Sequence, residues 1–333
     1  MHVPDHMIDD PTSVATATVA CATLAYAAYR SRTELTRRTI ATTAATGALV
    51  FALQMVSYPV STGTSGHLMG GVLAAALVGP WLGMMSVTLV LVVQATLFAD
   101  GGITALGTNT LLMAVIGTAA GWAVTRGVQR ALGGRLADTR YAPLAGGVGA
   151  LVSVPASALA FVALFAFGGT ATVPLGELTA SMRSVHALIG LGEGLITALV
   201  LALVLAVAPG VARIDARRQS AAALVHAPVG RAVGALSGIA AVSAVVLSSF
   251  AAAAPDGLEA TAAELGFLDV AGPHALAALP LADYGATSGS PVGVAGLLGT
   301  VMVAALSTVL LAAVRERVAA PVTVRSGSDA RAR

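Results

Sequence analysis

Residues 186–208 read HALIGLGEGLITALVLALVLAVA, and Glu193 is the only acidic residue in this run. A helix crosses the hydrocarbon core of a bilayer in about 20 residues, so the run is long enough to span a membrane. The rest of the chain has the same character: 56% of its 333 residues are hydrophobic, 10% are charged, and the mean hydropathy is +0.86. Soluble domains carry about 25% charged residues. The composition therefore indicates an integral membrane protein.

Long apolar runs recur along the whole chain, separated by charged or Gly- and Pro-rich breaks. They lack the period-two alternation of a membrane β-barrel, so we predict an all-α integral membrane protein. We expect about nine transmembrane helices, a seven-helix bundle followed by a two-helix C-terminal hairpin. The third run is short and is followed by Pro80, which indicates a short or tilted helix inside the bundle. The runs cover residues 12–29, 39–58, 67–80, 82–99, 107–125, 143–168, 186–208, 231–254 and 291–314.

The positions of the arginines predict the orientation of the chain. Arginines cluster after the first, fifth, seventh and ninth runs, whereas Arg183 alone lies in a loop on the opposite side. Short loops rich in basic residues face the cytoplasm. We therefore predict a cytoplasmic C-terminus and an N-terminus outside. Because no basic segment opens the chain, we expect no cleaved signal peptide and Met1 as the true terminus.

The sequence also divides into two units joined by a polar stretch. Residues 1–210 hold the first seven runs, residues 211–230 form an expected cytoplasmic linker, and residues 231–333 form a hairpin with an external loop and a cytoplasmic tail. The loop either attracts cations electrostatically or is an ordinary solvated loop, and for any single acid we favour the second interpretation. Its acids are Asp256, Glu259, Glu264, Asp269 and Asp283.

The first residues, MHVPDHMIDD, contain a potential metal chelate. The amine of Met1, the deprotonated backbone amide of His2 and the His2 Nδ1 atom would close a five-membered and a six-membered ring around one ion. Three nitrogens in one plane with a fourth position open suit Ni(II) or Cu(II). The alternative is that His2 is an exposed residue on a disordered tip. The chemistry of the residues alone favours that alternative.

A fourth ligand has to be external and close to the membrane, and His67 in SGHLMGG meets both conditions. The alternative is a histidine that only satisfies its hydrogen bonds at a helix start, and the residues support the two equally. His6 is able to reach the same site. His226 is cytoplasmic by the predicted topology, and His274 belongs to the second unit, so neither is expected at the main site.

Other polar residues lie in or beside the apolar runs. His186 and Glu193 are seven residues apart and therefore share one helix face. Their function is either a polar network beneath the site or a contact with a partner. The alternative is a hydrogen bond between packed helices, and the sequence does not decide between these interpretations. Asp100 and Asn109 frame DGGITALGTN, an outer loop whose glycines suit a tight fold over the site.

The sequence lacks the motifs of common enzyme classes. It contains no GxxxxGK[ST], HExxH, GxSxG or CxxC pattern, so we predict that the protein is not an enzyme. Its net charge of +2 gives no indication of nucleic-acid binding. Two functions in which the protein would act alone are a secondary metal-ion permease and a metal-dependent membrane enzyme. A permease predicts acids in several spans and an inverted repeat, but only Glu193 lies well inside a span.

Several separated motifs together resemble one family of membrane proteins. They are MHVPDHMID, SYPVSTGTSGHLMGGVLAAALVGPW, VQATLFADGGITALGTN and HALIGLGEGLIT, in this order within residues 1–210. They resemble the CbiM/NikM family, the substrate-binding membrane subunits of energy-coupling factor (ECF) transporters for cobalt and nickel. Residues from about 235 to 315, with PDGLEATAAELGF and PLADYG, resemble the PDGLE-type (NikN-like) component. The chain therefore resembles a fusion of the two.

The resemblance implies a set of metal ligands. In the family the N-terminal Met-His pair enters the bundle from outside and binds the ion through its amine, amide and imidazole, which implies Met1 and His2 here. The histidine of the SGHL motif implies His67 as a further ligand. The family start usually reads MHIPDG, whereas this chain has His6 in place of the glycine. His6 is then a spare ligand, a gate or a tolerated substitution.

The resemblance also implies the activity and the partners. The ion, Ni(II) or Co(II), is the transported substrate, and no cofactor is expected. The partners are a transmembrane coupling subunit of the T/Q type, cytoplasmic ATPase subunits and membrane lipid, without nucleic acid. The expected location is the bacterial cell membrane, with the chain crossing it several times. Planar nitrogen donors and the NikN-like tail favour Ni(II), and Co(II) stays open.

Overall fold

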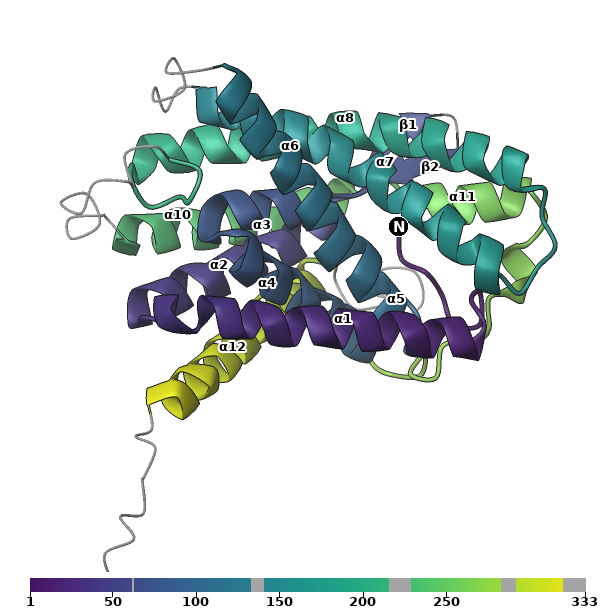
Figure 1. Cartoon of the computed structure of the whole chain (residues 1–333), viewed down its shortest axis with the longest axis horizontal. Coiled ribbons are helices and arrows are strands. Elements are labelled where there is room, and N and C mark those ends of the chain that lie inside the picture. The colour runs from purple at the N-terminus through teal and green to yellow at the C-terminus, as the bar shows by residue number, and fades with distance from the viewer. Residues whose placement is uncertain (62, 133–140, 216–228, 283–291, 320–333) are drawn as a thin grey trace, which may run out of the picture.

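The computed structural model describes residues 1–61, 63–132, 141–215, 229–282 and 292–319 (Figure 1). Most of the expected linker at 211–230, His226, Asp283 and the C-terminal tail lie outside the described residues. The described chain is mostly helical, which confirms the predicted all-α class in its main part. Its α-helices are α1 (Asp10–Ser31), α2 (Arg37–Gln54), α3 (Gly71–Val78), α4 (Pro80–Val93), α5 (Leu106–Asn109), α6 (Thr118–Ala131), α7 (Ala142–Gly168), α8 (Leu175–Val207), α10 (Val229–Val245), α11 (Gly257–Glu264) and α12 (Val292–Ala319).

Shorter elements connect or extend these helices. Two π-helical segments, η2 (Gln94–Phe98) and η3 (Thr110–Gly117), continue α4 and precede α6. Three 3₁₀ segments are η1 (Arg32–Glu34), η7 (Leu247–Phe250) and η8 (Leu268–Val270). A two-stranded antiparallel hairpin, β1 (Tyr58–Ser61) and β2 (Thr64–Gly66), forms between the second and third apolar runs, where no strand was predicted.

Six helical segments in the described part are long and apolar enough to cross a membrane, fewer than the nine expected. The helix α1 has sufficient length at 22 residues but is rich in Thr and Ser, and α2 begins with Arg37 and Arg38. The six segments are Pro80–Phe98, Leu106–Ala131, Ala142–Gly168, Leu175–Val207, Val229–Phe250 and Val292–Glu316. The chain is thus a multi-pass membrane protein, and the count of nine and its orientation stay predictions.

The helix α3 has 8 residues, all of them buried, so it is a short internal helix as the sequence indicated. At about 1.5 Å per residue it is far shorter than the hydrocarbon core of a bilayer. It ends at Gly79, whose φ of 97° suits glycine, and Pro80 then opens α4 in the first helical turn, where proline is tolerated. The break predicted at Pro80 therefore separates two helices.

The long helix α8 shows how the sequence produces this fold. Its outer face carries Leu191, Leu195 and Leu199, which are 57%, 62% and 61% exposed, as expected for a lipid-facing surface. Its inner face is buried and includes Glu193 and Gly194. A Cβ atom on Gly194 would lie 2.8 Å from the carbonyl oxygen of Gly147 in α7. Glycine at this position lets the two helices pack closely, as small residues do in membrane bundles.

The N-terminal segment enters the bundle and is fixed there. The terminus lies within the molecule near α11 in Figure 1, and Met1 is only 4% exposed. The Asn109 side chain accepts a hydrogen bond from Val3 N at 2.8 Å and donates one to Val3 O at 3.0 Å. One oxygen of Asp5 accepts bonds from Thr104 N and Oγ1, each at 2.7 Å. The N-terminal segment is therefore held by specific hydrogen bonds and does not form a disordered tip.

His6 occupies a turn in this segment and has a φ of 66°. This left-handed conformation suits glycine, which is the residue expected here from the family resemblance. The His6 side chain is exposed and lies against Gly272, and it is not part of the group formed by His2, His67 and Asp256. This position favours a tolerated substitution at a turn over a spare ligand.

We expect His6→Val to destabilise the fold and His6→Gly to be tolerated. A β-branched side chain is strongly disfavoured at positive φ, with a cost of about 1–2 kcal/mol. Thermal unfolding of both variants in detergent micelles measures this difference. Equal melting temperatures for the two variants would show that the turn does not need a left-handed residue.

Candidate metal centre

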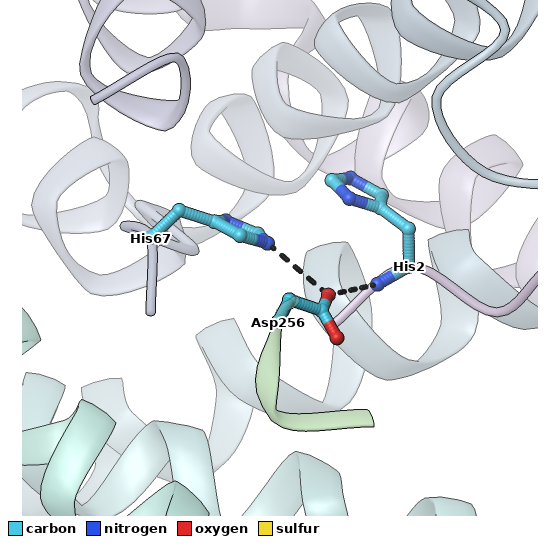
Figure 2. Close-up of side chains that lie close together, drawn as sticks. All are labelled: His2, His67 and Asp256. Atoms are coloured by element: carbon cyan, nitrogen blue, oxygen red, sulfur yellow. Dashed lines mark hydrogen bonds and ion pairs between the residues drawn. The ribbon is translucent and has the colours of Figure 1, made fainter. Parts of the chain in front are cut away.

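Three segments that are far apart in the sequence meet at the buried N-terminus. They are the first residues of the chain, the segment after the β1–β2 hairpin and the start of α11 (Figure 2). The hairpin leads directly into His67, and Gly66 at its end packs so closely on α8 that a Cβ atom would lie 2.7 Å from Ile189. The clustered side chains are His2, His67 and Asp256, whose potential ligand atoms all lie within 4.8 Å of one another.

The terminal amine and His67 are direct neighbours. The nitrogen of Met1 lies 2.7 Å from Nε2 of His67. The other ring nitrogen, Nδ1, lies 3.0 Å from the Leu68 carbonyl oxygen. A carbonyl oxygen only accepts hydrogen bonds, so Nδ1 carries the proton and Nε2 presents its lone pair to the amine. This arrangement orients His67 as a ligand, because a metal-binding imidazole commonly donates its other N–H to a carbonyl or carboxylate.

Asp256 approaches the same cluster from the C-terminal unit. Its Oδ2 atom lies 2.9 Å from the Met1 nitrogen and 3.7 Å from His67 Nε2. The backbone N–H of His2 also donates to Oδ2, at 3.4 Å. Figure 2 shows the carboxylate between the two histidines, which come from opposite sides. The cluster therefore joins amine, amide, imidazole and carboxylate groups.

His2 contributes only part of the chelate predicted from the sequence. Its backbone nitrogen faces Asp256, but its Nδ1 lies 3.0 Å from Oδ1 of Asp100. The His2 ring stacks on the His67 ring at a centroid distance of 5.1 Å, and its Nε2 has no hydrogen-bond partner among the described residues. To join a chelate with the amine, Nδ1 has to exchange Asp100 for the ion.

The electrostatics of the cluster favour a neutral imidazole beside ionised carboxylates. Burial and the adjacent terminal ammonium both lower the pKa of His67. Burial opposes ionisation of Asp256, but the ammonium and His67 hold the pKa of this carboxyl well below its usual range. Burial likewise opposes ionisation of Asp100, and His2 nevertheless lowers its pKa to about 2. His67 is therefore ready to act as a ligand at neutral pH.

Glu193 binds the backbone close to the candidate site. Its carboxylate oxygens accept hydrogen bonds from the backbone of Met69 at 2.5 Å and of Gly70 at 2.8 Å, immediately after His67. A carboxylate held by backbone donors fixes the path of this segment. His186 instead bonds through Nδ1 to the Met182 carbonyl at 2.8 Å, within its own helix. Of the interpretations left open by the sequence, these contacts fit a polar network beside the site as well as a hydrogen bond between packed segments.

The cluster borders a cavity of about 760 Å³. Acidic side chains at its walls include Asp100, Asp256 and Glu259, and His274 also lines it. A concave surface with this charge raises the local concentration of cations. The cavity is thus suited to admit a cation to the Met1 amine.

The residues predicted to bind metal are brought together, and one neighbour was missed. Met1, His2 and His67 meet, whereas His274 lines the cavity outside the cluster. Asp256 was treated as an acid of a solvated loop. The only local signal was its place in DGLE, where the spacing to Glu259 is typical of a capping box at a helix start. That signal predicts a helix but not the approach to Met1.

These features describe a multi-pass membrane protein with a buried cluster of groups that could hold a metal cation. A family described as "Cobalt uptake substrate-specific transmembrane region", CbiM, matches residues 2–211. The chain therefore belongs to this family.

Relatives with fused units support the same class. The putative fused nickel transport protein NikMN of Archaeoglobus fulgidus is 34% identical over 200 residues, which cover 60% of this chain and 63% of that relative. The probable fused nickel transport protein LarMN of Lactiplantibacillus plantarum is 36% identical over 128 residues, covering 38% of this chain and 39% of the relative. Both relatives are named as transport proteins.

A solved structure has a similar fold. The crystal structure of a truncated transition metal transporter has a TM-score of 0.54 and 28% sequence identity, and the match covers 62% of this chain and 99% of that one.

We expect Asn109→Ala to weaken metal binding by about 10–100-fold, the usual loss when a group that orients ligands is removed. The substitution deletes both hydrogen bonds to Val3 and so releases the segment that carries the amine. Equilibrium dialysis of Ni(II) against the purified protein measures the effect. Gln129→Ala is the matched control, because its amide contacts Ile214 far from the cluster. Equal losses in the two variants would argue against this role of Asn109.

Proposed function

We propose that the protein is the substrate-binding membrane subunit of an ATP-driven ECF transporter that imports Ni(II) or Co(II). The observation that carries this proposal is the terminal amine of Met1 at 2.7 Å from His67 Nε2 in a buried site. Two ligands at right angles, each about 2.0 Å from an ion, lie about 2.8 Å apart. The pair is therefore spaced as neighbouring ligands of one ion.

Capture of the ion follows from the donors that the chain offers. The amine of Met1 and Nε2 of His67 provide two nitrogens, and the amide nitrogen of His2 provides a third. The His2 ring turns from Asp100 to supply Nδ1 as the fourth. Such a set of in-plane nitrogens suits Ni(II), and Co(II) remains possible as a cargo because the family name refers to cobalt uptake. The ion is the transported substrate, and the protein performs no reaction on it.

The energy for transport has to come from partner chains. The sequence contains no GxxxxGK[ST] motif for binding the phosphates of ATP. We propose a T/Q-type membrane coupling subunit and cytoplasmic ATPase subunits as partners, in a bacterial cell membrane. Their movements would reorient this subunit and release the ion to the cytoplasm.

A stand-alone secondary permease is less consistent with the contacts of Glu193. A coupled carrier needs ionisable groups inside the membrane that are free to exchange ions or protons. Glu193 instead holds the backbone at Met69 and Gly70, so its two oxygens serve the architecture of the His67 segment.

We expect His67→Ala and His2→Ala each to abolish high-affinity Ni(II) binding. The first removes Nε2 of His67, and the second removes the imidazole that closes the six-membered chelate ring with the His2 amide. Isothermal titration of full-length protein with an untagged N-terminus measures both. His6→Gly serves as the control, since His6 lies outside the cluster. Unchanged affinity in the His2→Ala protein would contradict the proposed site.

Ni(II) affinity is expected to fall as the pH falls. Binding displaces protons from the terminal ammonium and from the His2 amide, and two displaced protons correspond to a loss of about 100-fold per pH unit. His67 adds no third proton near neutral pH, because its pKa is lowered and it is already neutral. Titrations between pH 6.5 and 7.5 in weakly coordinating buffers test this slope. A pH-independent affinity would contradict binding through the amine and the amide.

A further inference from the structure

The two oxygens of Asp256 have separate roles. Oδ1 accepts hydrogen bonds from Leu258 N at 2.8 Å and Glu259 N at 3.0 Å, so it caps the N-terminus of α11. Glu259 completes a capping box by accepting from the backbone N–H of Asp256. The cap fixes the plane of the carboxylate, and Oδ2 is thereby directed at Met1 and His67.

The segment before Asp256 is anchored on the hairpin that carries His67. Ser65 donates from its backbone N–H to Pro255 O at 2.9 Å and from Oγ to Ala254 O at 2.7 Å. Ala252 N donates to Ser57 O at 2.9 Å on the other side of the hairpin. The carboxylate and His67 are thus held by one framework, although the two residues are 189 positions apart.

On the other side, α11 packs against α8. A Cβ atom on Gly257 would lie 2.8 Å from Ile189 and 2.9 Å from Val185, so only glycine lets α11 start this close to α8. The position of Asp256 is therefore determined by contacts on two sides. A second contact of the C-terminal unit, Gly272 N to Asp5 O at 2.8 Å, holds the N-terminal segment as well.

We propose that Asp256, from the C-terminal unit, is a fifth ligand of the transported ion, with Oδ2 bound on one side of the plane of four nitrogens. This inference rests on the proposed function, because it assigns a further donor to the same site. It makes the C-terminal unit part of the metal centre.

The distances fit a ligand outside the plane. Oδ2 lies 2.9 Å from the Met1 nitrogen, 3.4 Å from the His2 amide nitrogen and 3.7 Å from His67 Nε2. Metal–nitrogen and metal–oxygen bonds of about 2.0–2.2 Å at right angles place the two donors about 3 Å apart. The distances from Oδ2 to the amine and to the amide nitrogen are close to 3 Å. The distance from Oδ2 to His67 Nε2 is longer, and a shift of less than 1 Å would bring it to the same value. Oδ2 therefore stands beside three of the four nitrogens at once.

The charge of the site also favours a carboxylate beside the ion. The terminal ammonium carries one positive charge, which Asp256 balances. A divalent ion bound to one deprotonated amide and three neutral nitrogens again leaves one positive charge. A net charge is costly to bury, and a carboxylate in contact with the ion offsets it. Asp100, beside the His2 ring, is a second anion at the site, but Asp256 is the carboxylate that lies beside the Met1 nitrogen and His67.

The test compares variants that keep the helix cap but lose the carboxylate. Asp256→Ser and Asp256→Asn retain good N-cap residues, so α11 should still form. Asp269→Asn is the matched control, because Asp269 is an exposed acid of the same unit. Full-length proteins with an untagged N-terminus are titrated with Ni(II), and the visible absorption spectrum of bound Ni(II) is recorded for each.

We expect both Asp256 variants to bind Ni(II) about 10–100-fold more weakly with an altered spectrum, and the control to match the wild type. Wild-type affinity and spectrum in Asp256→Ser would overturn the assignment of this ligand. Weaker binding with an unchanged spectrum would also overturn it, because Asp256 would then act on the site without touching the ion. Failure of the wild-type protein to bind Ni(II) at all would instead contradict the proposed function.

Discussion

The buried amine of Met1 is the constraint on which the rest of the structure depends. A charged group is costly to bury without a partner, and here it lies 2.9 Å from a carboxylate and 2.7 Å from an imidazole nitrogen. These partners come from the start of α11 and from the end of the β1–β2 hairpin. The need to satisfy one nitrogen atom therefore links the N-terminus, the membrane bundle and the C-terminal unit.

The surrounding contacts maintain this arrangement rather than bind the ion. Asn109 and Asp5 hold the N-terminal segment in place, and Glu193 holds the backbone that follows His67. Each of these side chains uses backbone donors or acceptors, so the position of the main chain, and with it the amine, is fixed from several elements. Preorganised ligands of this kind bind an ion without a further cost of ordering the chain.

The sequence predicted the helical membrane class, because apolar runs are visible directly. The residues alone favoured an exposed His2 and left His67 undecided, and only the family resemblance implied Met1, His2 and His67 as ligands. The hairpin at β1 and β2 was not predicted, because its short strands lie within a glycine-rich loop. Asp256 was not predicted as a neighbour of Met1, because their proximity arises from packing of α11 on α8 and on the hairpin. The left-handed conformation of His6 was not predicted, although the glycine at this position in the family start is consistent with it.

The central claim is that the ion binds to the chain terminus itself. Anomalous X-ray diffraction at the nickel absorption edge, from crystals of the full-length protein with an authentic N-terminus soaked in Ni(II), tests it most directly. The account predicts one strong peak within bonding distance of the Met1 nitrogen and of Nε2 of His67. A peak elsewhere in the cavity, for example between Asp100 and His274, with no density beside Met1, would contradict it.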